Sequence, residues 1–181
     1  MKKSMAIISI AVICLFIIAA GSAQAYTTGD TKTKYPIVLV PGVMGFDALF
    51  GTVEYFYKVA DGINKVAFGT DIWGNAKGKI AYNVNVSSWK KTEDRGNDLK
   101  IEIQKILMKH YNLTSVSQIT SSHKVNILAH SHGATTSRVA VSLIPSNIAS
   151  LTTVAGPHYG TPMADYAITI PKPVITMPKP F

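Results

Sequence analysis

Five residues centred on a serine carry the strongest chemical signal in the sequence. They are Ala129-His130-Ser131-His132-Gly133, a variant of the G-x-S-x-G nucleophile turn with alanine in the first position. An apolar run ends directly before them and a helical pattern begins directly after them. This turn requires that context, because it strains the backbone of the serine and lifts its hydroxyl clear of a sheet. We therefore predict that Ser131 is a catalytic nucleophile; the alternative is an ordinary serine at a helix N-terminus.

A serine nucleophile also needs donors for the oxyanion that forms on the attacked carbonyl. In a turn of this kind one donor is the backbone amide of the next residue, here His132, at the positive end of the following helix. The second donor comes from the loop after an earlier strand. Residues 41–46 follow the apolar run 37–40 and contain two glycines, so the amide of Val43 is the candidate. Taken without Ser131, this stretch is equally compatible with a simple glycine-rich turn.

The base that would activate Ser131 is not found in the sequence that follows it. The histidines after Ser131 are His132 and His158, and the acidic residue is Asp165. In a serine triad built on this turn the acid precedes the histidine along the chain, an order that does not occur here. We therefore expect His158 not to be the base, His130 to be structural, and residues 1–181 alone to have little or no turnover.

The elements that position Ser131 are expected to alternate between strands and helices. Apolar patterns predict strands at 37–40, 80–86, 125–128 and 148–154, with a loop after the first strand and helices starting at 96–98 and at 134. This order predicts an α/β fold with a mostly parallel sheet of about four strands and flanking helices. Residues 170–181 contain four prolines and are expected to be irregular.

The N-terminus has the pattern of a secretory signal peptide. Two lysines precede an apolar run, and Ala23-Gln24-Ala25 supplies a cleavage site. The run is too short to favour a membrane anchor. The single cysteine, Cys14, lies inside residues 1–25, so no disulfide or cysteine metal site is expected in the mature chain. Its basic residues are scattered, which argues against nucleic-acid binding.

Several separate stretches together resemble one known family. These are residues 35–47, 55–57, 125–133, 138–140, 148–154, 157–158, 160–161 and 164–165. In the same order and spacing they resemble the secreted bacterial triacylglycerol lipases of the Pseudomonas and Burkholderia type, which belong to the α/β-hydrolase superfamily. The sequence departs from the family at Pro41, where histidine is usual, and at Ala129, where glycine is usual. Neither change removes one of the two candidate oxyanion amides.

The resemblance implies both a function and a domain organisation. It implies that Ser131 is the nucleophile, that Val43 and His132 give the oxyanion amides, and that the substrate is a lipid ester at an oil–water interface. Residues 26–169 would form the N-terminal part of an α/β-hydrolase domain, between the signal peptide 1–25 and the tail 170–181.

The resemblance also bears on cofactors and partners. No cofactor is expected in this chain, because the structural calcium site that the family implies would lie in a C-terminal half. A lipase-specific folding chaperone is an expected partner. Two alternatives to a lipase stay open: another serine acyl hydrolase, such as a phospholipase or acyltransferase, and a non-enzymatic secreted remnant.

Overall fold

A single parallel sheet organises the protein. The computed structural model describes residues 29, 31–42, 55–56, 58–87, 90–162 and 164–165. In these residues four strands pair in the order β2-β1-β3-β4, and every pair is parallel. The strands are β1 (Ile37–Val40), β2 (Ala81–Asn83), β3 (Val125–His130) and β4 (Ile148–Val154). The helices are α2 (Val59–Phe68), α3 (Thr92–Tyr111) and α4 (Gly133–Leu143), with short 3-10 turns η1 (Val116–Gln118) and η2 (Pro145–Asn147).

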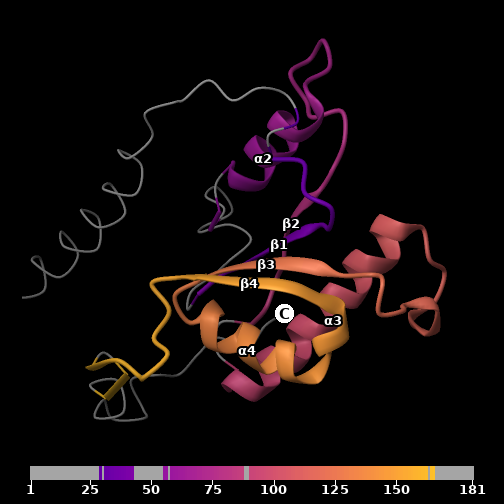
Figure 1. The fold of residues 1–181 in the computed structure, drawn as a ribbon. Coiled ribbons are helices and arrows are strands. Elements are labelled where there is room, and N and C mark those ends of the chain that lie inside the picture. Colours follow the sequence, from indigo (N-terminus) through magenta and orange to yellow (C-terminus); the bar gives the residue numbers. More distant parts are fainter. Residues whose placement is uncertain are drawn as a thin grey trace, which may run out of the picture.

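The helices cover the two faces of the sheet, as Figure 1 shows. Helices α3 and α4 pack together on one face, and α2 lies on the other. The apolar strand β1 is therefore enclosed from both sides, and Val38, Leu39 and Val40 are fully buried. The predicted α/β fold with a mainly parallel sheet of four strands is confirmed. The predicted signal peptide and the proline-rich tail lie outside the described residues.

Helix α2 occupies a segment that the sequence analysis assigned to a loop. Its sequence contains Asp61, Gly62 and Asn64, which are all poor helix formers. Asn64 is buried, and its amide group accepts hydrogen bonds from the Ile80 and Ala81 backbone amides at 2.7 and 2.8 Å. Contacts with the start of β2 thus stabilise a helix that its own composition does not favour.

Two predicted boundaries differ from the structure. Helix α3 begins at Thr92, before the predicted start at 96–98. Gly96, part of the predicted helix start, lies inside the helix. A Cβ atom on Gly96 would lie 2.3 Å from Val139 Cγ1, so this glycine permits close packing of α3 against α4. Strand β2 spans three residues of the predicted 80–86, although Val84 and Val86 beyond it are buried. Among the described helices, none is long and apolar enough to cross a membrane.

Candidate active site

Ser131 lies in a sharp turn between the end of β3 and the start of α4. Its φ angle is 53°, in the left-handed region that residues other than glycine avoid. Two backbone hydrogen bonds hold the turn: the Ser131 amide donates to Val154 O, and the Ala134 amide donates to Ser131 O, both at 2.9 Å. A conformation of this kind costs on the order of 1–3 kcal/mol and persists where surrounding contacts enforce it. The strand, turn and helix predicted around the serine are all present.

Two glycines allow other backbone segments to approach this turn. A Cβ atom on Gly42 would lie 2.8 Å from Ser131 Cβ and 3.1 Å from Ser131 Oγ. A Cβ atom on Gly133 would lie 2.5 Å from Val40 O and 2.7 Å from Pro41 O. The turn after β1 therefore touches both the serine and the first residue of α4. Ala129, by contrast, is fully buried with its methyl group accommodated.

His132 connects the serine turn to α3 and α4. Its carbonyl accepts three hydrogen bonds, from Thr135 Oγ1 at 2.9 Å and from Thr136 Oγ1 and N at 3.1 Å. Its Nε2 lies 3.0 Å from Thr92 Oγ1, at the start of α3. Burial lowers the pKa of His132 and nearby Arg95 lowers it further, which favours a neutral ring. The residue whose amide is the candidate oxyanion donor is thus held through both its carbonyl and its side chain.

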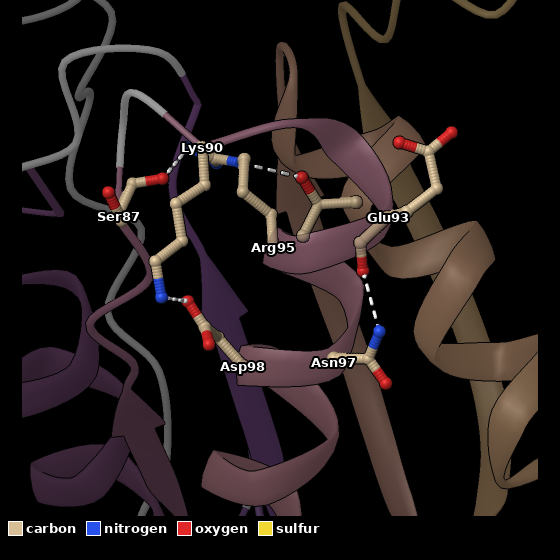
Figure 2. A network of polar contacts seen from close by, with 7 residues as sticks. Ser87, Lys90, Glu93, Arg95, Asn97 and Asp98 are labelled. Atoms are coloured by element: carbon tan, nitrogen blue, oxygen red, sulfur yellow. Dashed lines mark hydrogen bonds and ion pairs between the residues drawn. The ribbon is translucent and has the colours of Figure 1, made fainter.

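Arg95 is a buried residue of the site that the sequence analysis missed. It lies in the first turns of α3 and is fully buried. Its Nε donates to Thr136 Oγ1 at 2.9 Å, and its Nη1 donates to Ser87 O at 2.5 Å (Figure 2). Its Nη2 lies 3.2 Å from Pro41 O and 3.4 Å from Gly42 O. One guanidinium therefore joins α3 to α4, to the segment after β2 and to the turn beside Ser131.

The charge of Arg95 has no direct carboxylate partner among the described residues. Burial lowers the pKa of Arg95, while the more distant Asp98 carboxylate and Tyr55 act in the opposite direction. Asp98 pairs instead with Lys90, Nζ to Oδ2 at 2.8 Å (Figure 2). A signal for Arg95 existed in the sequence, because it precedes Leu99 by four residues and so continues the buried stripe of α3.

His130 pairs with Tyr55 on the other side of the turn. The Tyr55 hydroxyl lies 2.5 Å from His130 Nδ1, and burial lowers the pKa of His130. In a neutral ring Nδ1 can accept a hydrogen bond from the Tyr55 hydroxyl. Burial raises the pKa of Tyr55, and the Gly42 backbone amide acts in the opposite direction. His130 Nδ1 is therefore engaged with the Tyr55 hydroxyl.

Of the two remaining predicted residues, the structure describes only His158. Val43 falls outside the described residues. His158 is exposed, and its Nε2 lies 3.0 Å from Thr153 Oγ1. Within the described part of the chain, no histidine nitrogen forms a hydrogen bond with Ser131 Oγ, and no group of three histidine, cysteine or acidic residues could hold a metal ion.

Comparisons with known proteins identify relatives over most of the chain. No family model matches it. It is 32% identical over 166 residues to a triacylglycerol lipase of Vibrio cholerae, an alignment that covers 91% of this chain and 46% of that protein. It is 28% identical to a triacylglycerol lipase of Burkholderia plantarii, over 82% of this chain and 36% of the relative. It is 30% identical to a triacylglycerol lipase of Pseudomonas fragi, over 75% of this chain and 39% of the relative.

A solved structure shares the fold. The mature lipase BlEst2 of Bacillus licheniformis superposes with a TM-score of 0.52 at 21% identity, covering 81% of this chain and 50% of that one. The present chain therefore spans half or less of the length of each of these relatives.

Proposed function

Because this chain is a homologue of the bacterial triacylglycerol lipases and has the α/β-hydrolase fold, we propose that it is a serine ester hydrolase with Ser131 as nucleophile. The left-handed backbone of Ser131, at the junction of β3 and α4, is the observation that carries the proposal. A serine held at this energetic cost, next to a helix N-terminus, is typical of a nucleophile. The names of the homologues favour a lipid ester as the substrate.

The proposed reaction forms an acyl-enzyme. Ser131 Oγ attacks the ester carbonyl carbon while its proton passes to a base, and the carbonyl oxygen becomes an oxyanion. The amides of His132 and Val43 donate hydrogen bonds to this oxyanion, and the N-terminus of α4 favours its charge. The tetrahedral intermediate then expels the alcohol, which takes up the proton, and leaves the acyl group on Ser131. Water hydrolyses this ester to the free acid and regenerates the serine.

We also propose that residues 1–181 alone turn over ester substrates slowly. No acid-then-histidine pair follows Ser131 in the sequence, so no base is assigned. Serine hydrolases that lose triad members keep a residual acceleration of roughly 10³–10⁴ over water, from oxyanion donors and binding. We therefore expect acylation of Ser131 to be measurable and turnover to be far below that of a lipase.

Acylation by p-nitrophenyl acetate tests the proposal directly. Intact-mass spectrometry should detect one acetyl group per chain, and peptide mapping should locate it on Ser131. Added imidazole should raise the acylation rate in proportion to its concentration, because imidazole can act as a general base toward the Ser131 hydroxyl. Ser131→Ala should abolish the adduct. Ser142→Ala, at an exposed position on α4, is the matched control and should not change it.

Two outcomes would count against the proposal. Acetylation spread over lysines and unchanged in Ser131→Ala would refute Ser131 as the nucleophile. Rapid turnover that Ser131→Ala removes would support the nucleophile but refute the expected lack of a base.

We also propose that the chain is exported and cleaved after Ala25. The lysine pair, the apolar run and the small-residue site in residues 1–25 support this proposal. N-terminal sequencing of the protein from the culture medium should give Tyr26 as the first residue. Retention of Met1 on exported protein would refute it.

A further inference from the structure

Residues 70–76 form a tight, well-braced turn beyond the end of α2. The Asp71 amide donates to Asn75 O at 2.8 Å, and the Gly74 amide donates to Asp71 O at 3.1 Å. The Asp71 carboxylate oxygen Oδ1 accepts hydrogen bonds from the Trp73 and Asn75 amides, both at 2.9 Å. The backbone of the turn is thus fixed by its own hydrogen bonds, and it lies in the loop at the top of Figure 1.

The tip of this turn presents two large apolar side chains to solvent. Ile72 is 91% exposed and Trp73 is 82% exposed. Tryptophan is usually well buried, so this exposure has no explanation in the packing of the described residues. The adjoining residues Thr70, Gly74 and Asn75 carry no large apolar side chain. Ile72 and Trp73 are therefore two exposed apolar side chains flanked along the chain by small or polar residues.

Basic residues precede the starts of three strands in the sheet. Lys34, Lys79 and Lys124 lie one to three residues before β1, β2 and β3, respectively. Because these strands are parallel, their beginnings meet at one edge. Lys77, directly after the turn, is near enough to Asp71 to lower the pKa of that carboxyl, although the amide hydrogen bond from Asn75 contributes more.

We propose that the tip formed by Ile72 and Trp73, together with the lysines of this edge, attaches the protein to an anionic lipid bilayer. A tip of two side chains offers far less than the roughly 800 Å² per partner of a stable protein interface. A bilayer can enclose a protruding tip, and tryptophan prefers the headgroup region of a membrane. Anionic headgroups attract nearby lysines.

This surface is separate from the candidate active site. Ser131 follows the end of β3, whereas the turn precedes the start of β2, so the two lie toward opposite edges of the parallel sheet. An attached chain would direct its Ser131 edge away from the bilayer. The inference therefore does not depend on the proposed hydrolase activity.

Fluorescence of Trp73 in the proposed mature chain, which begins at Tyr26, tests the proposal. The sequence contains two tryptophans, Trp73 and Trp89, so a Trp89→Phe background isolates the tip. Vesicles of phosphatidylcholine with phosphatidylglycerol should shift the emission of Trp73 to the blue, and brominated lipid should quench it. Pure phosphatidylcholine should have a much weaker effect, and 1 M salt should reverse most of the binding because it shortens the screening length to about 3 Å.

Substitutions at the tip and at the basic edge should weaken vesicle binding by cosedimentation. Trp73→Ala and Ile72→Ser should each weaken it roughly tenfold, through lost apolar insertion. Lys77→Ala and Lys79→Ala should each weaken it about fivefold. Ile101→Ser, at an apolar α3 residue that is 46% exposed, is the control and should have no effect.

A matched pair of variants tests whether vesicle binding depends on the hydrogen bonds that hold the turn. Asp71→Asn and Asp71→Ala both remove the negative charge, but the asparagine keeps an oxygen that can accept from the Trp73 and Asn75 amides. Asp71→Ala should therefore bind vesicles more weakly than Asp71→Asn.

Three results would overturn the proposal. They are absent binding to anionic vesicles, equal binding to both lipid mixtures, and lipid-independent self-association that buries Trp73.

Discussion

Replacement of Arg95 by methionine should strongly destabilise the protein. Methionine keeps most of the side-chain length but removes every donor. The carbonyls of Ser87, Pro41 and Gly42 would lose the guanidinium, as would Thr136 Oγ1. A buried acceptor left without a donor costs about 1–3 kcal/mol, and release of the buried charge offsets part of the total. We expect the free energy of unfolding to fall by about 3–5 kcal/mol, a large share of the roughly 5–15 kcal/mol of a typical domain.

Urea unfolding followed by far-ultraviolet circular dichroism measures this loss. Arg138→Met is a matched control, because Arg138 is an exposed arginine on α4, and surface substitutions usually stay within about 0.5 kcal/mol. Arg95→Lys should lie between the wild type and Arg95→Met, because an ammonium keeps the charge but cannot reach acceptors in several directions at once. A loss below about 1 kcal/mol for Arg95→Met, similar to that of Arg138→Met, would refute the reasoning about buried acceptors.

Three further predictions concern strain, packing and pH. Ser131→Gly should raise the free energy of unfolding by up to about 1 kcal/mol in urea titrations, because glycine adopts the observed φ of 53° without strain; a loss would contradict this. Gly96→Ala should lower stability by about 1–3 kcal/mol because its Cβ meets Val139. The double variant Gly96→Ala with Val139→Ala should recover part of that loss, and a strictly additive cycle would exclude the contact. The pKa of His132 is lowered in the folded protein, so protonation favours unfolding. The urea midpoint should therefore fall as the pH drops below about 6.5 toward the folded pKa, and His132→Gln should reduce this slope.

Local spacing made the serine turn predictable. The turn motif, the strand before it and the helix after it are neighbours along the chain, so their signals reinforce one another. Helix α2 was not predictable in the same way, because Asp61, Gly62 and Asn64 disfavour a helix. Helix α2 is instead stabilised by hydrogen bonds that the Ile80 and Ala81 amides, 16 and 17 positions along the chain, donate to Asn64.

The hydrogen-bond partners of Arg95 could not be predicted from the sequence, for a related reason. Its hydrogen bonds with Thr136 and Pro41 join residues 41 and 54 positions apart. Periodicity could place Arg95 on the buried face of α3, but it could not reveal which backbone groups would meet it there. The partners depend on how the ends of three different segments come together.

The buried Arg95 supplies donors to carbonyls in the turn after β1. In a trans peptide the carbonyl and the amide of one plane point in opposite directions. The Pro41 carbonyl faces Arg95, and the Gly42 amide of the same plane faces the Tyr55 hydroxyl beside Ser131. A turn that directs an amide to one side therefore directs the carbonyl of the same plane to the other side, where a buried carbonyl needs a donor. Arginine offers five N–H donors in a rigid fork, whereas an apolar residue of similar volume would leave those carbonyls unpaired. The buried cation of Arg95 is thus explained by the carbonyls of Ser87, Pro41 and Gly42, without a carboxylate partner in the described part of the chain.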